Sequence, residues 1–156
     1  EQNIAHSMTA LMAQNKGAGK KNRMQEGFRC GMVLESIYGI FIFLVCFIFA
    51  KPLMCLFVQD EEVIMHGVTY LHLISIMYIL PAFTNGIQGF FRGIGDLKIT
   101  LISSLVNMTV RVIVAAPLVF SLHLGIEALP YSYLAGWIGM LMAELPLLIR
   151  TYKAYE

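Results

Sequence analysis

The sequence predicts an all-α integral membrane protein, a polytopic bundle of transmembrane helices. Three observations lead to this fold class: an apolar composition, four long apolar runs, and basic residues gathered in alternate loops. Of the 156 residues, 58% are hydrophobic and 13% are charged, and the mean hydropathy is +0.70. A soluble domain carries about 25% charged residues. Lipid is therefore the expected surrounding of most of the chain.

Each of the four apolar runs is long enough to cross a bilayer as a helix. Spanning about 30 Å of hydrocarbon takes about 20 apolar residues in helical conformation. A membrane β-barrel would instead show alternating segments of about 10 residues. The predicted transmembrane helices cover residues 31–50, 67–91, 99–122 and 128–149.

The distribution of basic residues predicts the orientation of these helices. Nine of the eleven Lys and Arg residues precede the first run, separate the second from the third, or follow the fourth. Basic loops stay in the cytoplasm during membrane insertion. We therefore expect a multi-pass protein of the cell (plasma) membrane with a cytoplasmic C-terminus. The nine are Lys16, Lys20, Lys21, Arg23, Arg29, Arg92, Lys98, Arg150 and Lys153.

Two N-terminal segments precede the first run. Residues 1–15 begin without Met and lack the basic-then-apolar order of a signal peptide, so we interpret them as the end of a preceding transmembrane helix. Residues 16–30 are expected to form a cytoplasmic loop. Residues 31–156 then contain the four helices.

Ionisable residues inside a span are costly and are either paired or functional. Arg111 and Glu144 differ in depth by about 9 Å at 1.5 Å per residue, and their side chains tilt toward each other. We predict a structural ion pair between them, with a part in proton or ion coupling as the alternative. Glu35 tilts toward the cytoplasmic headgroups and is expected to reach water. His72 is expected to be an isolated imidazole on a helix surface.

Two polar stripes run along the second and third helices. At 100° per residue, Asn107 falls within a polar arc of the third helix, and a second arc lies on the second helix. Lipid cannot satisfy amides and hydroxyls, so both stripes need protein or water opposite them. Interhelical hydrogen bonding and a solvated substrate pathway remain equal alternatives. The substrate-pathway candidates are Tyr70, Tyr78, Asn85, Gln88 and Asn107.

Proline and small residues predict where a helix kinks and where two helices pack closely. Pro81 lies mid-span, where it removes a backbone hydrogen bond and usually kinks a helix. Gly89-x-x-x-Gly93 and Ala135-x-x-x-Gly139-x-x-x-Ala143 permit close helix packing.

We find no pattern that indicates an enzyme, a metal site or a cofactor. Catalytic residues of the Ser/His/Asp kind, paired carboxylates and metal-ligand spacings are not evident in the sequence. Cys30, Cys46 and Cys55 are an odd number without a Cys-x-x-Cys pair. A net charge of +1 does not favour nucleic acid as a partner.

A motif between the second and third runs resembles a family signature. Gln88-Gly89-Phe90-Phe91-Arg92-Gly93-Ile94-Gly95-Asp96 resembles the Q-G-x-x-R-G-x-G-D pattern of the multidrug and toxic compound extrusion (MATE) family, carried by Gln88, Gly89, Arg92, Gly93, Gly95 and Asp96. Residues 13–20 resemble the loop that enters the ninth helix of that family. Residues 128–131 resemble the entry to its twelfth helix.

The resemblance implies a fragment of a twelve-helix transporter, from the end of helix eight to helix twelve in the C-terminal lobe. Such a protein exchanges Na⁺ or H⁺ for lipophilic cationic compounds by alternating access. Its implied partners are the bilayer, the missing N-terminal lobe and small cationic substrates. Some members use an acidic residue in helix ten, but residues 67–91 contain none. The coupling-ion site is therefore expected outside this segment, in the N-terminal lobe.

Two other functions remain open at this point. A lipid-linked oligosaccharide flippase of related fold would be expected to carry more basic residues in its cavity than Arg111 alone. A four-helix membrane scaffold that transports nothing is the second alternative.

Overall fold

The computed structural model describes residues 1–121, 123–126 and 128–154, and these residues are almost entirely helical, without a strand among them. The helices are α1 (Gln2–Gly17), α2 (Lys21–Ile48), α3 (Ala50–Cys55), α4 (Glu61–Met77), α5 (Ile79–Gly93), α6 (Leu97–Phe120) and α7 (Ala128–Ala154). The predicted all-α fold class is confirmed.

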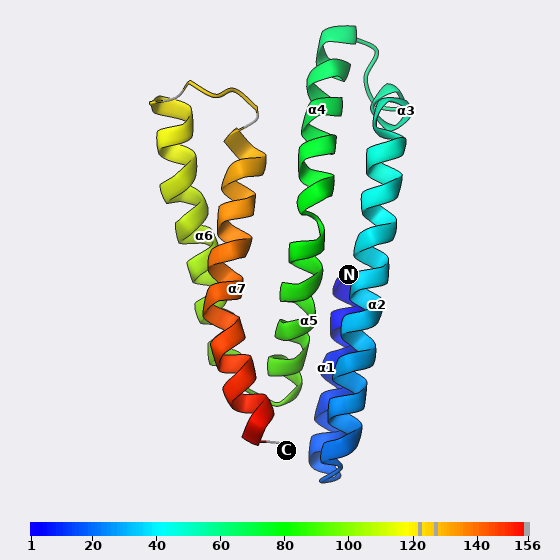
Figure 1. The fold of residues 1–156 in the computed structure, drawn as a ribbon, viewed down its shortest axis with the longest axis vertical. Coiled ribbons are helices and arrows are strands. Elements are labelled where there is room, and N and C mark those ends of the chain that lie inside the picture. Colours follow the sequence, from blue (N-terminus) through cyan, green and yellow to red (C-terminus); the bar gives the residue numbers. More distant parts are fainter. Residues whose placement is uncertain (122, 127, 155–156) are drawn as a thin grey trace.

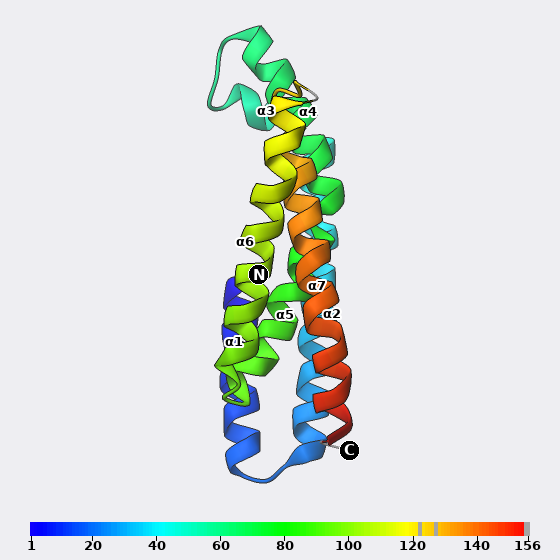
Figure 2. The same cartoon turned by 90° about the vertical axis from the view of Figure 1, so that its left-hand side faces the viewer.

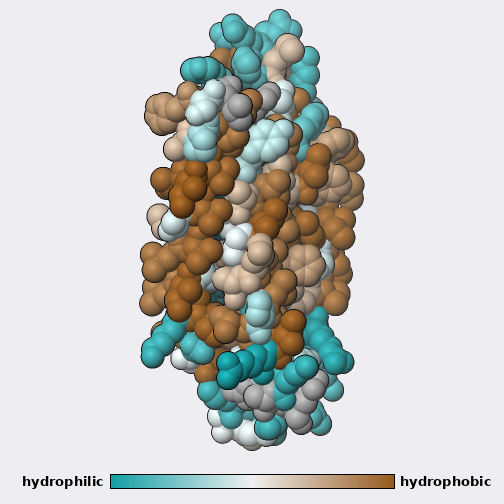
Figure 3. All heavy atoms as spheres, turned by 60° about the vertical axis from the view of Figure 1, so that its left-hand side comes forward, coloured by the Kyte–Doolittle hydropathy of each residue, from teal (hydrophilic) through white to brown (hydrophobic). Residues whose placement is uncertain are grey.

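The long helices run up and down beside one another, and the chain turns at the two ends of an elongated bundle (Figure 1 and, turned by 90°, Figure 2). Three helices, α2, α6 and α7, are long and apolar enough to cross a membrane, and α4 with α5 passes the same test as one bent pair. On the face shown in Figure 3, a broad hydrophobic belt separates two hydrophilic ends. The turns before α2 and α6 and the C-terminal end of α7 share one end of the bundle, here called the basic end.

The helix of the first predicted span, residues 31–50, differs from these limits at both ends. α2 begins at Lys21 because Met24 and Phe28 pack into the core, so the expected loop 16–30 contracts to a short turn around Gly19, whose φ is +67°. α2 stops at Ile48 because Pro52 has no N–H to donate to the Ile48 carbonyl and its ring clashes there. The chain resumes as α3.

The second span is bent by 47° at Tyr78, between α4 and α5. Pro81 has no N–H to donate to the carbonyl of Met77, one turn earlier, and a proline ring clashes with a carbonyl at that position, so the helical hydrogen-bond ladder is interrupted. The kink expected from Pro81 is confirmed. The two halves together run from Glu61 to Gly93, beyond the predicted 67–91.

The other two spans agree more closely with the predicted ranges. α6 covers Leu97–Phe120 against the predicted 99–122, whose last residue lies outside the described residues. α7 begins at Ala128 and extends to Ala154, beyond the predicted residue 149. α1 contains most of residues 1–15 and packs against both α2 and α5.

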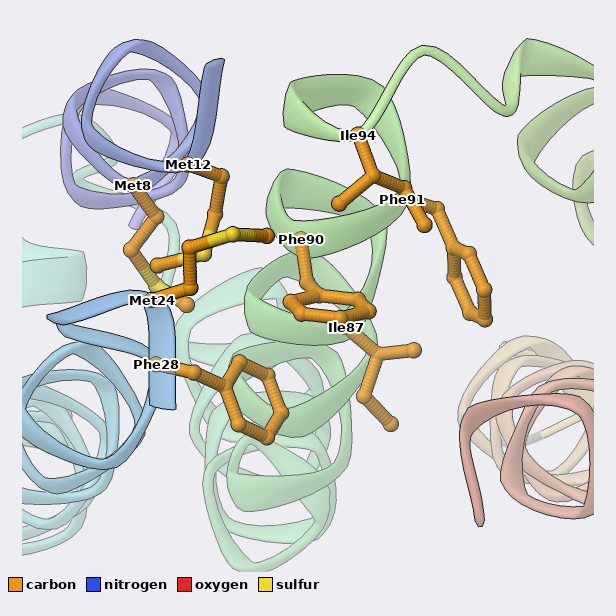
Figure 4. Close-up of a cluster of buried hydrophobic side chains, with 8 residues drawn as sticks. All are labelled: Met8, Met12, Met24, Phe28, Ile87, Phe90, Phe91 and Ile94. Atoms are coloured by element: carbon orange, nitrogen blue, oxygen red, sulfur yellow. The ribbon is translucent and has the colours of Figure 1, made fainter. Parts of the chain in front are cut away.

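The core lies where α1, α2 and α5 meet near the basic end (Figure 4). Phe28 of α2 and Phe90 of α5 have ring centroids 5.1 Å apart, and Phe90 meets Phe91 edge to face at 5.6 Å. Such aromatic pairs stabilise beyond the area they bury. The cluster consists of Met8, Met12, Met24, Phe28, Ile87, Phe90, Phe91 and Ile94.

Two glycines allow α5 to approach α1 closely, as the Gly89-x-x-x-Gly93 spacing predicts. A Cβ on Gly89 would stand 2.7 Å from the carbonyl oxygen of Ala5, and one on Gly93 would collide with Met12. The Thr9 hydroxyl donates to the Gly89 carbonyl across the same contact, at 3.1 Å. Only a residue without a side chain fits here.

We predict that Gly89→Ala destabilises the protein by about 1–3 kcal/mol, because the added methyl group must push α1 and α5 apart. The measurement is the thermal unfolding midpoint in detergent. Gly17→Ala is the matched control, since nothing lies within 4 Å of a Cβ at that glycine. Equal midpoints for the two variants would contradict the proposed close contact.

Candidate functional site

The candidate site is a polar pocket of about 250 Å³ between α5, α6 and α7. It takes shape because the polar stripes of α5 and α6 face each other and α7 closes the third side. None of its lining residues carries a charge. The polar pocket is lined by Pro81, Thr84, Asn85, Gln88, Ser104, Asn107, Met108, Trp137 and Met140.

Amide groups supply most of the hydrogen-bonding capacity of the polar pocket. The Asn107 side-chain nitrogen donates to the sulfur of Met140 at 3.5 Å, and the Asn85 nitrogen donates to a Glu1 carboxylate oxygen at 3.3 Å. The Gln88 nitrogen donates to the Ser103 hydroxyl at 3.5 Å. Amide oxygens therefore remain as acceptors, the groups that a cationic or hydrogen-bonding guest uses.

Three of the five substrate-pathway candidates, Asn85, Gln88 and Asn107, line the polar pocket, and two do not. Tyr70 lies in electrostatic range of Tyr133 and Arg111, whereas Tyr78 lies among Glu1, Tyr38 and Glu35. The expected stripe assumed a straight helix from Tyr70 to Gln88. The break at Tyr78 interrupts that periodicity, so neither tyrosine lines the pocket, although Tyr78 and Asn85 both lie near Glu1.

Arg111 and Glu144 do not form the expected ion pair, and the register of α6 against α7 explains why. Arg111 packs against Gly136 and places its guanidinium 3.6 Å from the centroid of the Tyr133 ring. Glu144 lies beyond Gly136 by about 12 Å along α7. The pairing of Asn107 with Met140 sets the same register and brings Glu144 opposite Ser103 instead.

The Glu144 carboxyl is fully buried. Gln88 and Ser103 lie beside it and Arg92 is within electrostatic range, but neither carboxyl oxygen receives a hydrogen bond of regular geometry. The Ser103 hydroxyl donates to the Thr100 carbonyl at 3.1 Å. A carboxyl without such partners is costly to keep ionised in an apolar interior.

Glu35 is also fully buried and does not reach water. The expected route toward the headgroups is wrong because α5 covers this face of α2. The Glu35 Cγ lies 3.8 Å from a Cβ built on Gly86, and neither carboxyl oxygen has a hydrogen-bond partner.

His72 contacts the break at the end of α2. Its Nε2 donates to the Phe47 carbonyl at 3.1 Å, and its ring lies 4.7 Å from the Phe47 ring. This carbonyl is one of the last of α2, whose ladder Pro52 ends. The imidazole thus caps a helix end, a contact that helical angles alone did not reveal.

The motif residues Gln88 to Asp96 have separate structural tasks around the α5–α6 turn. Gln88 lines the polar pocket, and Arg92 donates from Nε to the Gln88 carbonyl at 3.2 Å. Gly95 has a φ of +83°, which favours glycine, and the Asp96 N–H donates to the Phe91 carbonyl at 2.9 Å. Lys16 of α1 donates to the Ile94 carbonyl and ties the turn to α1.

Known proteins resemble this chain in sequence and in fold. The model of the MatE family matches residues 2–118. A relative described as "Probable multidrug resistance protein NorM", from Thermotoga maritima, is 25% identical over 139 residues, which are 88% of this chain and 28% of that protein. The chain therefore spans little more than a quarter of the relative's length.

Two solved structures share the fold. One is the inward-facing conformation of a multidrug resistance MATE family transporter of the MOP superfamily, with a TM-score of 0.89 and 16% identity over 94% of this chain and 33% of that one. The other is the MATE transporter ClbM in complex with Rb⁺, with a TM-score of 0.79 and 18% identity over 99% of this chain and 37% of that one.

We predict that the stability losses of Arg111→Met and Glu144→Gln are additive within about 0.5 kcal/mol, because the two side chains have different neighbours. Arg111→Met and Tyr133→Leu form the matched cycle and should show coupling of about 0.5–2 kcal/mol from the cation–π contact. Thermal unfolding of the full-length protein measures both cycles. Coupling between Arg111 and Glu144 with none between Arg111 and Tyr133 would reverse this assignment.

Proposed function

The chain belongs to the MatE family, the multidrug and toxic compound extrusion transporters, and on this premise we propose that it forms part of the C-terminal lobe of a cation-coupled multidrug antiporter. The whole protein is a multi-pass membrane protein that exports lipophilic cationic compounds in exchange for H⁺ or Na⁺. It resides in the plasma membrane with its C-terminus in the cytoplasm. Nine of the eleven Lys and Arg residues lie on one side of the predicted spans, which supports that orientation.

The observation that carries this proposal is the uncharged polar pocket between α5, α6 and α7. Asn85, Gln88 and Asn107 offer carbonyl oxygens, and Trp137 offers an aromatic wall. Lipophilic cations are held by aromatic faces and by neutral acceptors without a permanent counter-ion, which also allows their release. A pocket of about 250 Å³ forms only one part of a binding cavity. The N-terminal lobe of the same protein supplies the opposite wall.

Alternating access follows from two lobes that rock around a midplane site. The bent α4–α5 pair, with its 47° break, places a discontinuity beside the polar pocket. Residues 67–91 carry no carboxylate, so the coupling ion acts through the N-terminal lobe in this proposal.

We expect Asn107→Leu in the full-length protein to lower ethidium efflux about tenfold, since it replaces an acceptor of the polar pocket by an apolar side chain and removes about 1.4 kcal/mol of binding. Efflux is measured in cells that express equal amounts of each variant. Thr109→Val is the matched control, because Thr109 is an exposed residue of the same helix outside the pocket. Equal efflux for both variants and the unaltered protein would remove the pocket from the pathway.

We also expect residues 1–156 expressed alone to give no efflux above background, because alternating access requires both lobes. The comparison is ethidium efflux against the full-length protein at matched membrane levels. Transport by the isolated segment would refute the two-lobe proposal and favour a complete smaller transporter.

A further inference from the structure

A second cavity, separate from the polar pocket, lies between α2 and α7 at the basic end of the bundle. It measures about 390 Å³, and we call it the α2–α7 groove. It has no lining residue in common with the polar pocket. The groove is lined by Phe28, Arg29, Leu148, Ile149, Tyr152 and Lys153.

Apolar side chains form the floor of the groove, and they alone bridge the two helices. No Cα atom of α2 lies within 8 Å of a described Cα atom of α7. The rings of Phe28 and Tyr152 cross this gap with centroids 5.9 Å apart. Leu148 and Tyr152 pack against the buried core, while Ile149 keeps 56% of its surface exposed. An extended hydrocarbon chain can lie along such a wall.

One exposed cation from each helix flanks this apolar wall. Arg29 of α2 and Lys153 of α7 are both exposed, and neither forms an ion pair with any described residue. Glu26, three residues before Arg29, and Glu156, three residues after Lys153, are the acidic residues nearest in sequence, and the described residues that line the groove include no acidic side chain. The buried Tyr152 hydroxyl adds a donor that has no acceptor among the described residues. The local charge therefore favours an anion.

The groove lies at the boundary between the apolar belt and the charged end of the bundle. Arg29 lies just before the apolar run that starts at residue 31, and Lys153 follows the run that ends at residue 149. Phosphate groups of lipids lie at this depth, directly outside the hydrocarbon. A free anion would satisfy the two cations but would leave the apolar wall unused.

We propose that the α2–α7 groove binds one anionic phospholipid of the adjacent leaflet. The lipid phosphate lies between Arg29 and Lys153, and an acyl chain runs along Leu148 and Ile149. Guanidinium groups form charge-assisted hydrogen bonds with phosphate oxygens, and basic pockets between transmembrane helices favour such headgroups. The bound lipid joins the end of α7 to α2, two helices whose backbones do not meet. This site is independent of the proposed transport function.

Native mass spectrometry of the full-length protein tests the site. The protein is extracted from liposomes of equal phosphatidylglycerol and phosphatidylcholine, and retained phosphatidylglycerol is counted. Arg29→Gln with Lys153→Gln should lower retention about tenfold, because each basic residue near a membrane surface contributes measurably to anionic-lipid binding. Lys20→Gln with Lys21→Gln is the matched control, since it removes two charges from the same end outside the groove.

A third variant separates a lipid from a free anion. Ile149→Trp narrows the groove but keeps both cations, so it should lower lipid retention as well. Added inorganic phosphate should not displace the lipid from the unaltered protein. Equal loss in the control pair would overturn the proposal in favour of a diffuse charge effect. Unchanged retention in the Arg29 and Lys153 variant would overturn it too, and would indicate that another segment of the protein fills the groove.

Discussion

The close contact of α5 with α1 is the constraint on which the arrangement of this segment depends. Gly89 and Gly93 bring the two backbones together, and the Thr9 hydroxyl crosses the contact to the Gly89 carbonyl. In lipid, apolar side chains gain nothing by leaving one apolar surrounding for another, so close backbone packing and hydrogen bonds must hold helices together. Because the glycine face packs against α1, the adjacent face of α5 turns Gln88 toward α6 and α7. Asn85 lies between the two faces, where it lines the polar pocket and donates to Glu1.

The α6–α7 hairpin completes the site through its register. The pairing of Asn107 with Met140 and of Arg111 with Gly136 determines which polar groups meet. Arg111 lies over an aromatic ring, while Glu144 lies next to two neutral side chains of α5 and α6. The uncharged polar pocket and the buried carboxyl next to it follow from the same register, and both share Gln88.

Prolines determine where the backbone departs from straight helices, and these departures explain some of the differences from the sequence expectations. Pro52 ends α2, and Pro81 produces the bend at Tyr78. Helical angles counted across such a break no longer give the relative orientation of side chains on its two sides, and neither Tyr70 nor Tyr78 lines the polar pocket. Pro117 and Pro146 lie inside α6 and α7 without ending either helix. A proline in the sequence thus indicates where a helix can break, and the neighbouring helices determine whether it does.

The sequence by itself determined the fold class, the approximate extent of the long apolar helices, the kink, the glycine contact and three of the pocket residues. These depend on local composition and periodicity, because hydrocarbon demands that each span satisfy its own backbone. Only the tertiary structure decided the partners of Arg111, Glu144 and Glu35, and the α2–α7 groove. Depth along a span follows from counting residues, but rotation about the helix axis and register against a neighbour come from side-chain packing between segments distant in sequence.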